Sequence, residues 1–249
     1  MIRLLFSLVI VLLSVAHVSA KSDTIYVNED IQLIHLQDSV FVHVSWINSE
    51  RYGRISCNGM IIVRQGEAVM VDTPMNNEQT RQIYEYLEQT WGVTITRHIA
   101  GHFHVDCIGG LPYLQDKGVK SIACRLTVNK CKEENLPVPS IVFEAEYDFT
   151  FNGLPIECRY YGGAHSFDNI TVWLPRQQIL FGGCMVKSAR SKGLGNLSDA
   201  VLDEWDVTLE KIQYAYPNIQ KVITGHGSIG GSELLHHTIG LVRKKQATL

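Results

Sequence analysis

The sequence lacks the signals that would divide the chain or adapt it to a charged partner. Its 249 residues contain no linker rich in proline, glycine and serine, no block of like charges, no low-complexity tract and no internal repeat. A chain of this length suits one large domain as well as two small ones, so without a boundary signal we predict a single domain. The formal net charge is only −3 and comes without a basic patch. We therefore expect no nucleic-acid partner.

The amino-terminal segment predicts export. Arg3 precedes an apolar stretch over residues 4–15, and small residues at 18–20 stand before Lys21. This order is typical of a secretory signal peptide, and the apolar stretch is shorter than the roughly 20 residues that span a membrane. No cysteine that could carry a lipid follows it directly. We expect a signal peptide over residues 1–20 and a mature monomer over 21–249 without stable membrane association; a retained anchor is the alternative.

Cysteine is sparse for an exported chain held together by disulfides. The six residues are Cys57, Cys107, Cys124, Cys131, Cys158 and Cys184. A chain this long buries a sufficient core without cross-links, so we expect at least one thiol to serve another purpose. Cys124 and Cys131 lie about two turns apart on a predicted helix, roughly 10 Å along its axis, and are too distant to bridge each other.

Two series of strand and helix patterns follow one another along the chain. Apolar, β-branched runs between turn residues predict strands, and apolar residues at helical spacing predict helices. The first series comprises strands over 31–36, 40–46, 60–63, 68–71, 94–100 and 121–123, a helix from a capping pair at Asn76 and Gln79 to Trp91, a short helix after Gly109-Gly110, and a helix over 125–134. The second comprises strands over 141–145, 147–151, 155–160, 170–174, 178–181 and 221–224, and helices over 202–216 and 235–242.

These two comparable series predict two packed β-sheets with helices outside, an α/β sandwich. A polar stretch over residues 48–54, tipped by Tyr52-Gly53, interrupts the first series. It is either an ordinary hairpin loop or a mobile flap over a site.

Two histidines and an aspartate lie close together at His102, His104 and Asp106. They follow the predicted strand over 94–100, in a turn flanked by glycines. Imidazole nitrogen and carboxylate oxygen are both good ligands for zinc. A lone histidine is usually structural, and we assign that role, or a surface position, to His35, His43, His98, His236 and His237; His17 lies in the signal peptide.

Three more candidate ligands stand at the ends of other predicted strands, each beside glycine. His165 follows Gly162-Gly163-Ala164, Cys184 follows Gly182-Gly183, and His226 lies between Gly225 and Gly227. Glycine permits the tight turns by which a short loop presents a ligand, and functional side chains commonly lie on such loops. The four strand ends together predict a metal centre.

This set of residues resembles the di-zinc subclass B1 of the metallo-β-lactamases. The similarity covers essentially the whole mature chain, including residues 58–61, 71–74, 168–170, 181–184 and 195–200. Other hydrolases of the wider superfamily, such as glyoxalase II, typically have a histidine after the motif's aspartate and a bridging aspartate in the second half. This chain has Cys107 and Cys184 there, which favours the lactamase.

The resemblance implies an αββα sandwich of two mixed sheets, two Zn²⁺ ions and a periplasmic enzyme. It implies hydrolysis of the amide bond of penicillins, cephalosporins and carbapenems by a metal-bound hydroxide, and thus antibiotic resistance. The first zinc would be bound by His102, His104 and His165, and the second by Asp106, Cys184 and His226. Three imidazoles plus water form an open catalytic zinc site, and zinc lowers the pKa of bound water to about 7.

Three further roles follow from the same resemblance. Lys187 would pair with the substrate carboxylate, and Asn196 would lie near the lactam carbonyl as an oxyanion donor; Asp106 and Asn196 are thus the catalytic candidates. Asp72 either supports a metal loop by hydrogen bonding or caps the turn before Pro74.

Cys107 departs from the many relatives that have arginine beside the ligand aspartate. We expect it to pack in the interior. It could instead be oxidised, weaken the second zinc site, or form a disulfide with Cys184 that would destroy that site.

Two other functions fit the ligand set. One is hydrolysis of a thioester or lactone on the same fold, against which Cys184 argues. The other is metal binding without catalysis.

Overall fold

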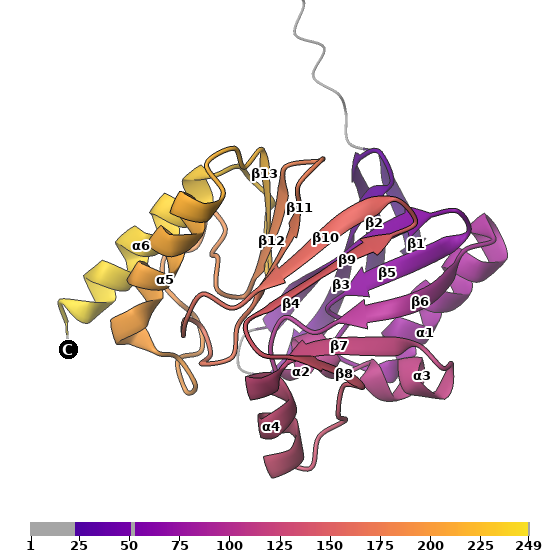
Figure 1. Ribbon diagram of the computed structural model, residues 1–249, viewed down its shortest axis with the longest axis horizontal. Coiled ribbons are helices and arrows are strands. Elements are labelled where there is room, and N and C mark those ends of the chain that lie inside the picture. The colour runs from indigo at the N-terminus through magenta and orange to yellow at the C-terminus, as the bar shows by residue number, and fades with distance from the viewer. Residues whose placement is uncertain (1–22, 51–52, 249) are drawn as a thin grey trace, which may run out of the picture.

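Two β-sheets packed face to face form the centre of the protein, and helices cover their outer sides (Figure 1). The structure, a computed structural model, describes residues 23–50 and 53–248. The predicted signal peptide and Tyr52 lie outside the described residues. The arrangement confirms the predicted α/β sandwich of two mixed sheets.

The first sheet has eight strands within the described residues, and they follow chain order. They are β1 (Thr24–Asn28), β2 (Ile31–Gln37), β3 (Val40–Ser49), β4 (Gly53–Arg64), β5 (Glu67–Val71), β6 (Thr94–Ile99), β7 (Lys120–Cys124) and β8 (Ile141–Phe143). Neighbours from β1 to β5 are antiparallel, and those from β5 to β8 are parallel. The parallel part brings the carboxyl ends of β5 and β6 to one edge, where the histidine motif begins.

The second sheet has five strands in the order β13-β12-β11-β10-β9. They are β9 (Glu146–Phe151), β10 (Leu154–Arg159), β11 (Thr171–Leu174), β12 (Ile179–Gly183) and β13 (Lys221–Thr224). Strands β12 and β13 run parallel, while the other neighbours are antiparallel. The carboxyl ends of β12 and β13 therefore lie side by side, so the residues that come after them can meet.

Helices complete the layers on both sides. They are α1 (Asn77–Tyr86), the π-helical turn η1 (Leu87–Trp91), α2 (Val105–Ile108), α3 (Leu111–Asp116), α4 (Arg125–Glu133), α5 (Leu202–Ala215) and α6 (Glu233–Gln246). Oδ1 of Asn76 accepts a hydrogen bond of 2.8 Å from the backbone N–H of Gln79, which confirms the predicted cap. No helix of the described residues has the length and apolar character needed to cross a membrane.

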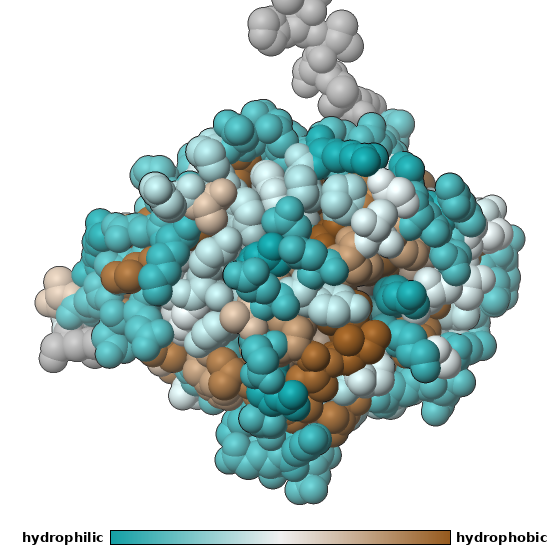
Figure 2. All heavy atoms as spheres, viewed as in Figure 1, coloured by the Kyte–Doolittle hydropathy of each residue, from teal (hydrophilic) through white to brown (hydrophobic). Residues whose placement is uncertain are grey.

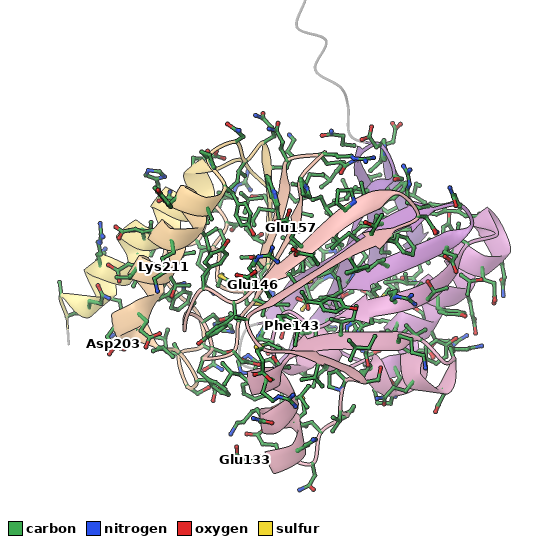
Figure 3. The ribbon with its side chains drawn as sticks, viewed as in Figure 1. Glu133, Phe143, Glu146, Glu157, Asp203 and Lys211 are labelled. Atoms are coloured by element: carbon green, nitrogen blue, oxygen red, sulfur yellow. The ribbon has the colours of Figure 1, made fainter. Side chains whose placement is uncertain are left out.

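Three hydrophobic layers hold the sandwich together. Val42 and Phe181 are among the buried residues that fill the space between the sheets. Ile83 belongs to the layer outside the first sheet, and Trp205 of α5 to the layer outside the second. Phe143 lies in the inner core, whereas Asp203 and Lys211 of α5 are exposed (Figure 3). The face drawn in Figure 2 is mostly hydrophilic, with a smaller hydrophobic area.

The structure differs from the predicted elements at several places. Strand β1, whose residues are mostly half-buried, gave no clear pattern and was not predicted. The polar stretch over 48–54 is mostly paired strand, because Asn48 lies opposite Arg54 and Ser49 opposite Gly53. This pairing agrees with the hairpin alternative for the stretch; Arg51 and Tyr52 lie outside the described residues. Strand β8 pairs with β7 and therefore belongs to the first sheet, whereas the prediction placed this strand in the second series. The prediction was wrong because apolar alternation does not specify which sheet a strand joins.

Candidate metal centre

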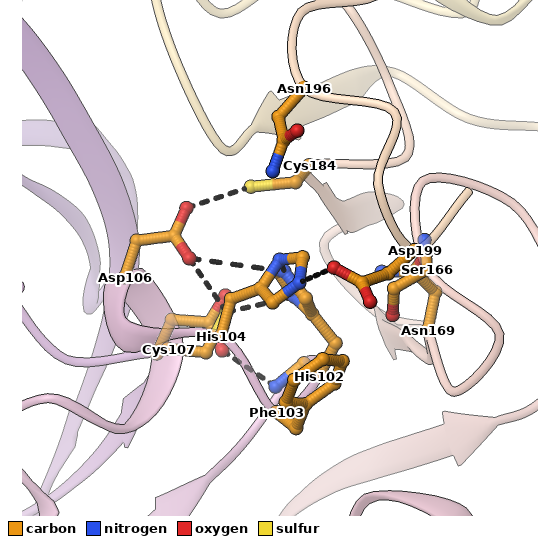
Figure 4. A network of polar contacts seen from close by, with 12 residues as sticks. His102, Phe103, His104, Asp106, Cys107, Ser166, Asn169, Cys184, Asn196 and Asp199 are labelled. Carbon is orange, nitrogen blue, oxygen red and sulfur yellow. Dashed lines mark hydrogen bonds and ion pairs between the residues drawn. The ribbon is translucent and has the colours of Figure 1, made fainter. Parts of the chain in front are cut away.

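The structure brings all six predicted ligands together beyond the ends of β6, β10, β12 and β13. Figure 4 labels His102, His104, Asp106 and Cys184 among them. Their donor atoms form two groups, and within each group all lie within 4.8 Å of one another. The first group is His102, His104 and His165, and the second is Asp106, Cys184 and His226. A further set meeting the same limit, His102, Asp106 and Cys107, links the two groups.

The first group consists of three imidazole rings packed edge to face. Nε2 of His102 lies 2.9 Å from Nδ1 of His104. The ring centre of His165 lies 5.3 Å from that of His102 and 5.2 Å from that of His104. Burial lowers the pKa of His102 to about 4 and that of His165 well below its ordinary value. At neutral pH these two rings are therefore uncharged, which is the form that binds a metal.

The second group is connected by hydrogen bonds. The Cys184 thiol donates to Oδ2 of Asp106 over 3.1 Å, and Nε2 of His226 lies 3.2 Å from the same oxygen. Burial raises the pKa of Cys184 well above its ordinary value. Burial would also raise the pKa of Asp106, but hydrogen bonding to His226 and the nearby imidazoles hold it well below its ordinary value. In this group, protons lie between the donor atoms that a cation would join.

A single glycine allows the two strand ends of the second group to approach. A Cβ atom at Gly225 would lie 2.4 Å from Sγ of Cys184 and 2.8 Å from its backbone nitrogen. Any other residue there would push apart the loops that carry Cys184 and His226. The position beside the predicted ligand His226 is therefore glycine for a steric reason.

Hydrogen bonds to residues outside the two donor groups orient two of the histidines. Nε2 of His104 lies 3.0 Å from Oδ2 of Asp199, and Nδ1 of His226 donates to the carbonyl oxygen of Ser56 over 2.8 Å. Such contacts fix the tautomer and ring orientation of a metal-binding histidine. Asp199 was not predicted to support the site. Its segment resembled the family, but a contact across 95 residues of sequence has no local signature.

Cys107 is buried, as expected for a packing residue, and its thiol also contacts a ligand. Sγ of Cys107 lies 2.9 Å from Nδ1 of His102, the nitrogen opposite the one that faces His104. All six cysteines are free in the structure. Cys107 lies in α2, a one-turn helix that also carries Asp106, where the sequence predicted only a turn.

Buried polar side chains hold the segments that carry the ligands. Oδ1 of Asp72 accepts a hydrogen bond of 2.6 Å from the backbone N–H of Gly101, so Asp72 supports the loop that leads into His102. Nε2 of His43 bonds to the carbonyl oxygen of Asp72 over 2.9 Å, and Nε2 of His98 to that of Cys107 over 3.2 Å. The predicted structural role of His43 and His98 is thereby confirmed.

The two predicted substrate-binding residues lie outside the six-residue cluster. Lys187 is partly buried, and its Nζ lies 5.3 Å from the centre of the Trp205 ring. Within the described residues it has no ion pair with a carboxylate, and burial lowers its pKa. Asn196 is exposed and donates to Oγ of Ser198 over 3.0 Å. In Figure 4 its side chain is drawn above Cys184.

The donor set fits a metal ion better than it fits a set of ordinary hydrogen bonds. Nδ1 of His165 is buried and has no hydrogen-bond partner within the described residues, and the three imidazoles of the first group have no acidic group between them. Imidazole, thiolate and carboxylate together suit a borderline cation. The arrangement defines a metal-binding protein.

Comparisons with known proteins agree with this class. Residues 52–226 match the family model described as the metallo-beta-lactamase superfamily. A metallo-beta-lactamase type 2 of Bacteroides fragilis is 40% identical, covering 97% of this chain and 96% of its own. One of Bacillus sp. (strain 170) is 34% identical, covering 93% and 91%. The solved structure of a metallo-beta-lactamase from Pontibacter korlensis has a TM-score of 0.83 at 30% identity, covering 86% of this chain and 99% of that one. The chain belongs to the metallo-β-lactamase superfamily, which confirms the resemblance inferred from its motifs.

Proposed function

We propose that the protein hydrolyses the amide bond of β-lactam antibiotics in a zinc-dependent reaction and so confers resistance to them. The observation that carries the proposal is the pair of adjacent donor groups, one of three imidazoles and one of carboxylate, thiol and imidazole. The names of the relatives support the same reaction. The centre is accessible, since the side chain of His226 is 42% exposed.

Two zinc ions would be held, one by each group. His102, His104 and His165 would bind one ion, and Asp106, Cys184 and His226 the other. When bound, zinc supplies a nucleophilic oxygen at neutral pH and polarises the carbonyl that is attacked. Asp199 and the backbone at Ser56 would keep His104 and His226 oriented toward their ions.

The remaining steps would depend on side chains around the two groups. Lys187 would bind the substrate carboxylate, because its ammonium group lacks a carboxylate partner within the described residues. Asn196 would donate its amide hydrogen to the lactam carbonyl oxygen as charge develops there. Asp106 is ionised at neutral pH. It would help to hold the second ion, and its Oδ2 would accept and return a proton during the reaction.

The cellular setting completes the proposal. The mature chain would be a single domain over residues 21–249, acting as a monomer in the periplasm after removal of residues 1–20. Mass spectrometry of the exported protein would locate its amino-terminus, and sedimentation would give its oligomeric state.

Steady-state hydrolysis of nitrocefin and imipenem by the zinc-loaded mature chain tests the activity. We expect turnover of both, loss of turnover with a chelator, and recovery with zinc. A thioester substrate in parallel separates the proposal from thioester hydrolysis on the same fold. Zinc bound without hydrolysis of either lactam would instead indicate a binding protein and refute the proposal.

Replacement of the proposed carboxylate-binding lysine tests the substrate assignment. Lys187→Met should raise KM for imipenem about tenfold or more, because a charge-assisted hydrogen bond is lost. The control is Lys192→Met, at an exposed lysine on the following loop. An unchanged KM in the Lys187 variant would show that another group binds the carboxylate.

A further inference from the structure

Trp205 of α5 lies in the interior and contacts residues of two different proposed roles. Its side chain is fully buried. The centre of its ring lies 6.0 Å from that of His165, and the two rings are inclined by 60°. Nζ of Lys187 lies above the same ring, 5.3 Å from its centre. One buried side chain therefore joins a predicted ligand of the first donor group to the predicted carboxylate-binding lysine.

The same tryptophan also fixes the backbone that leads to Lys187. Its Nε1–H group donates a hydrogen bond of 2.9 Å to the carbonyl oxygen of Met185, two residues before the lysine. The backbone N–H of Lys187 donates to Oγ1 of Thr238 on α6 over 2.9 Å. Helices α5 and α6 thus hold the backbone of the lysine, while the indole ring lies against its ammonium group.

An aromatic face orders an ammonium group in a different way from a carboxylate. The electrons of the ring attract a cation above it, most strongly for tryptophan and where water is excluded. The ring carries no net charge, so it leaves the full positive charge of Lys187 available to an incoming anion. A lysine has a long flexible stem, and ordering that stem costs binding affinity unless the free protein has already ordered it.

We propose that Trp205 is a positioning residue that holds the Lys187 ammonium group in place and so favours β-lactams that carry a carboxylate over those that do not. This role rests on the proposed function, in which Lys187 binds the substrate carboxylate. Trp205 acts through the lysine and through no contact of its own with the reacting atoms. Its aromatic face therefore lowers KM for an anionic lactam and leaves kcat unchanged.

Fluorinated tryptophans at position 205 test the contact while they keep the ring and its N–H donor. Fluorine withdraws electrons from the indole face and weakens its attraction for a cation. Successive fluorination should raise KM for imipenem stepwise, by about two- to tenfold in total, with kcat unchanged. The control is the same series at Trp173, a buried tryptophan of the same layer that stacks on Tyr216. An unchanged KM at position 205, or equal rises at both positions, would overturn the proposal.

A lactam without a free carboxylate separates positioning from general damage to the fold. Trp205→Leu removes the aromatic face and should raise KM for nitrocefin several-fold, but it should leave KM for the methyl ester of nitrocefin unchanged. In a Lys187→Met background, Trp205→Leu should add no further rise, because the ring acts through the lysine. Equal rises for acid and ester, or additive rises in the double variant, would refute a role through Lys187. The fluorinated series decides the matter if Trp205→Leu fails to fold.

The position of the lysine can be measured whether or not the protein hydrolyses lactams. Protons above an aromatic ring are shielded, so the ε-methylene protons of Lys187 should resonate upfield of those of the exposed Lys192 in a ¹³C–¹H spectrum of the zinc-loaded protein. Loss of the signal in Lys187→Met assigns it. A shielded lysine in a protein without lactam hydrolysis would support the contact and count against the proposed function. An ordinary lysine shift would refute the contact itself.

Discussion

The two donor groups differ in how their polar atoms are satisfied. In the first group, three imidazoles face one another, and Nδ1 of His165 has no hydrogen-bond partner within the described residues. In the second, the carboxylate of Asp106 receives hydrogen bonds from Cys184 and His226. The second group can therefore satisfy itself with protons. In the first group His102 and His104 contact each other, but His165 has no partner that replaces a cation.

This difference predicts unequal behaviour toward metal. An ion entering the second group must displace the proton of Cys184, whose pKa burial raises, so its affinity should depend steeply on pH. An ion entering the first group meets the imidazoles of His102 and His165 already deprotonated at neutral pH. We expect the first group to bind its ion more tightly and with less dependence on pH.

The largest expected effect comes from removing a ligand of the first group. His165→Ala should lower kcat/KM for nitrocefin on the order of a thousandfold, because the nucleophile and the polarised carbonyl both depend on that ion. Metal analysis should show loss of about one ion per chain. His236→Ala, at an exposed histidine of α6, is the control. Full activity of the His165 variant would contradict the assignment of the first group.

The framework beneath both groups should weaken in acid. Burial lowers the pKa of His98 to about 4 from its ordinary 6.5, and the pKa of His43 to about 4 likewise. Between these values the unfolded chain takes up protons that the folded chain does not. The contribution of each histidine to the free energy of unfolding is therefore complete above pH 6.5. It falls as the pH drops toward 4, by up to about 3 kcal/mol per histidine.

Urea unfolding of the metal-free protein between pH 4.5 and 7 measures this dependence. His98→Gln, which can still donate to the carbonyl oxygen of Cys107, should reduce the slope by about 1.4 kcal/mol per pH unit at most. His236→Gln should leave the slope as in the unmodified chain. Equal slopes in all three proteins would show that the acid sensitivity arises elsewhere.

Removing the thiol of the second group should have a smaller effect than removing His165. Cys184→Ser should lower kcat/KM about 10- to 100-fold, since the first group keeps its ion while the second loses its softest ligand. In cobalt-substituted protein the sulfur-to-metal absorption band should disappear. If the Cys184 variant retained two tightly bound ions and unchanged activity, the expected difference in metal binding between the two groups would be wrong.

The smallest expected effect comes from the contact between Asp199 and His104, a ligand of the first group. Asp199→Asn keeps the shape of the side chain but removes the charge that faces Nε2 of His104. The affinity for the first ion should fall about tenfold, with the second ion little affected. Chelator competition measures both affinities. A fall in affinity for the second ion alone would contradict the assignment of Asp199 to the first group.

Much of the fold was predictable because the pattern that specifies it is local. Strands β3, β5 and β12 and helix α5 are evident from alternation, helical spacing and flanking turn residues. For the stretch over 48–54 the sequence left a hairpin loop and a flap as alternatives, because its polar residues carry no apolar alternation that would reveal the strand pairing of Asn48 with Arg54. The prediction for strand β8 placed it in the wrong series, because three residues cannot specify the sheet that they join.

The sequence by itself determined the chemistry of the centre: six donor residues, their types, and their positions after strands beside glycine. The tertiary structure alone decided the contacts between distant segments. It set Cys184 against Asp106 across 78 residues of sequence and Asp199 against His104 across 95, and it placed Cys107 against His102. Local sequence specifies where a strand ends and which residues come next, whereas the packing of the two sheets determines which strand ends meet.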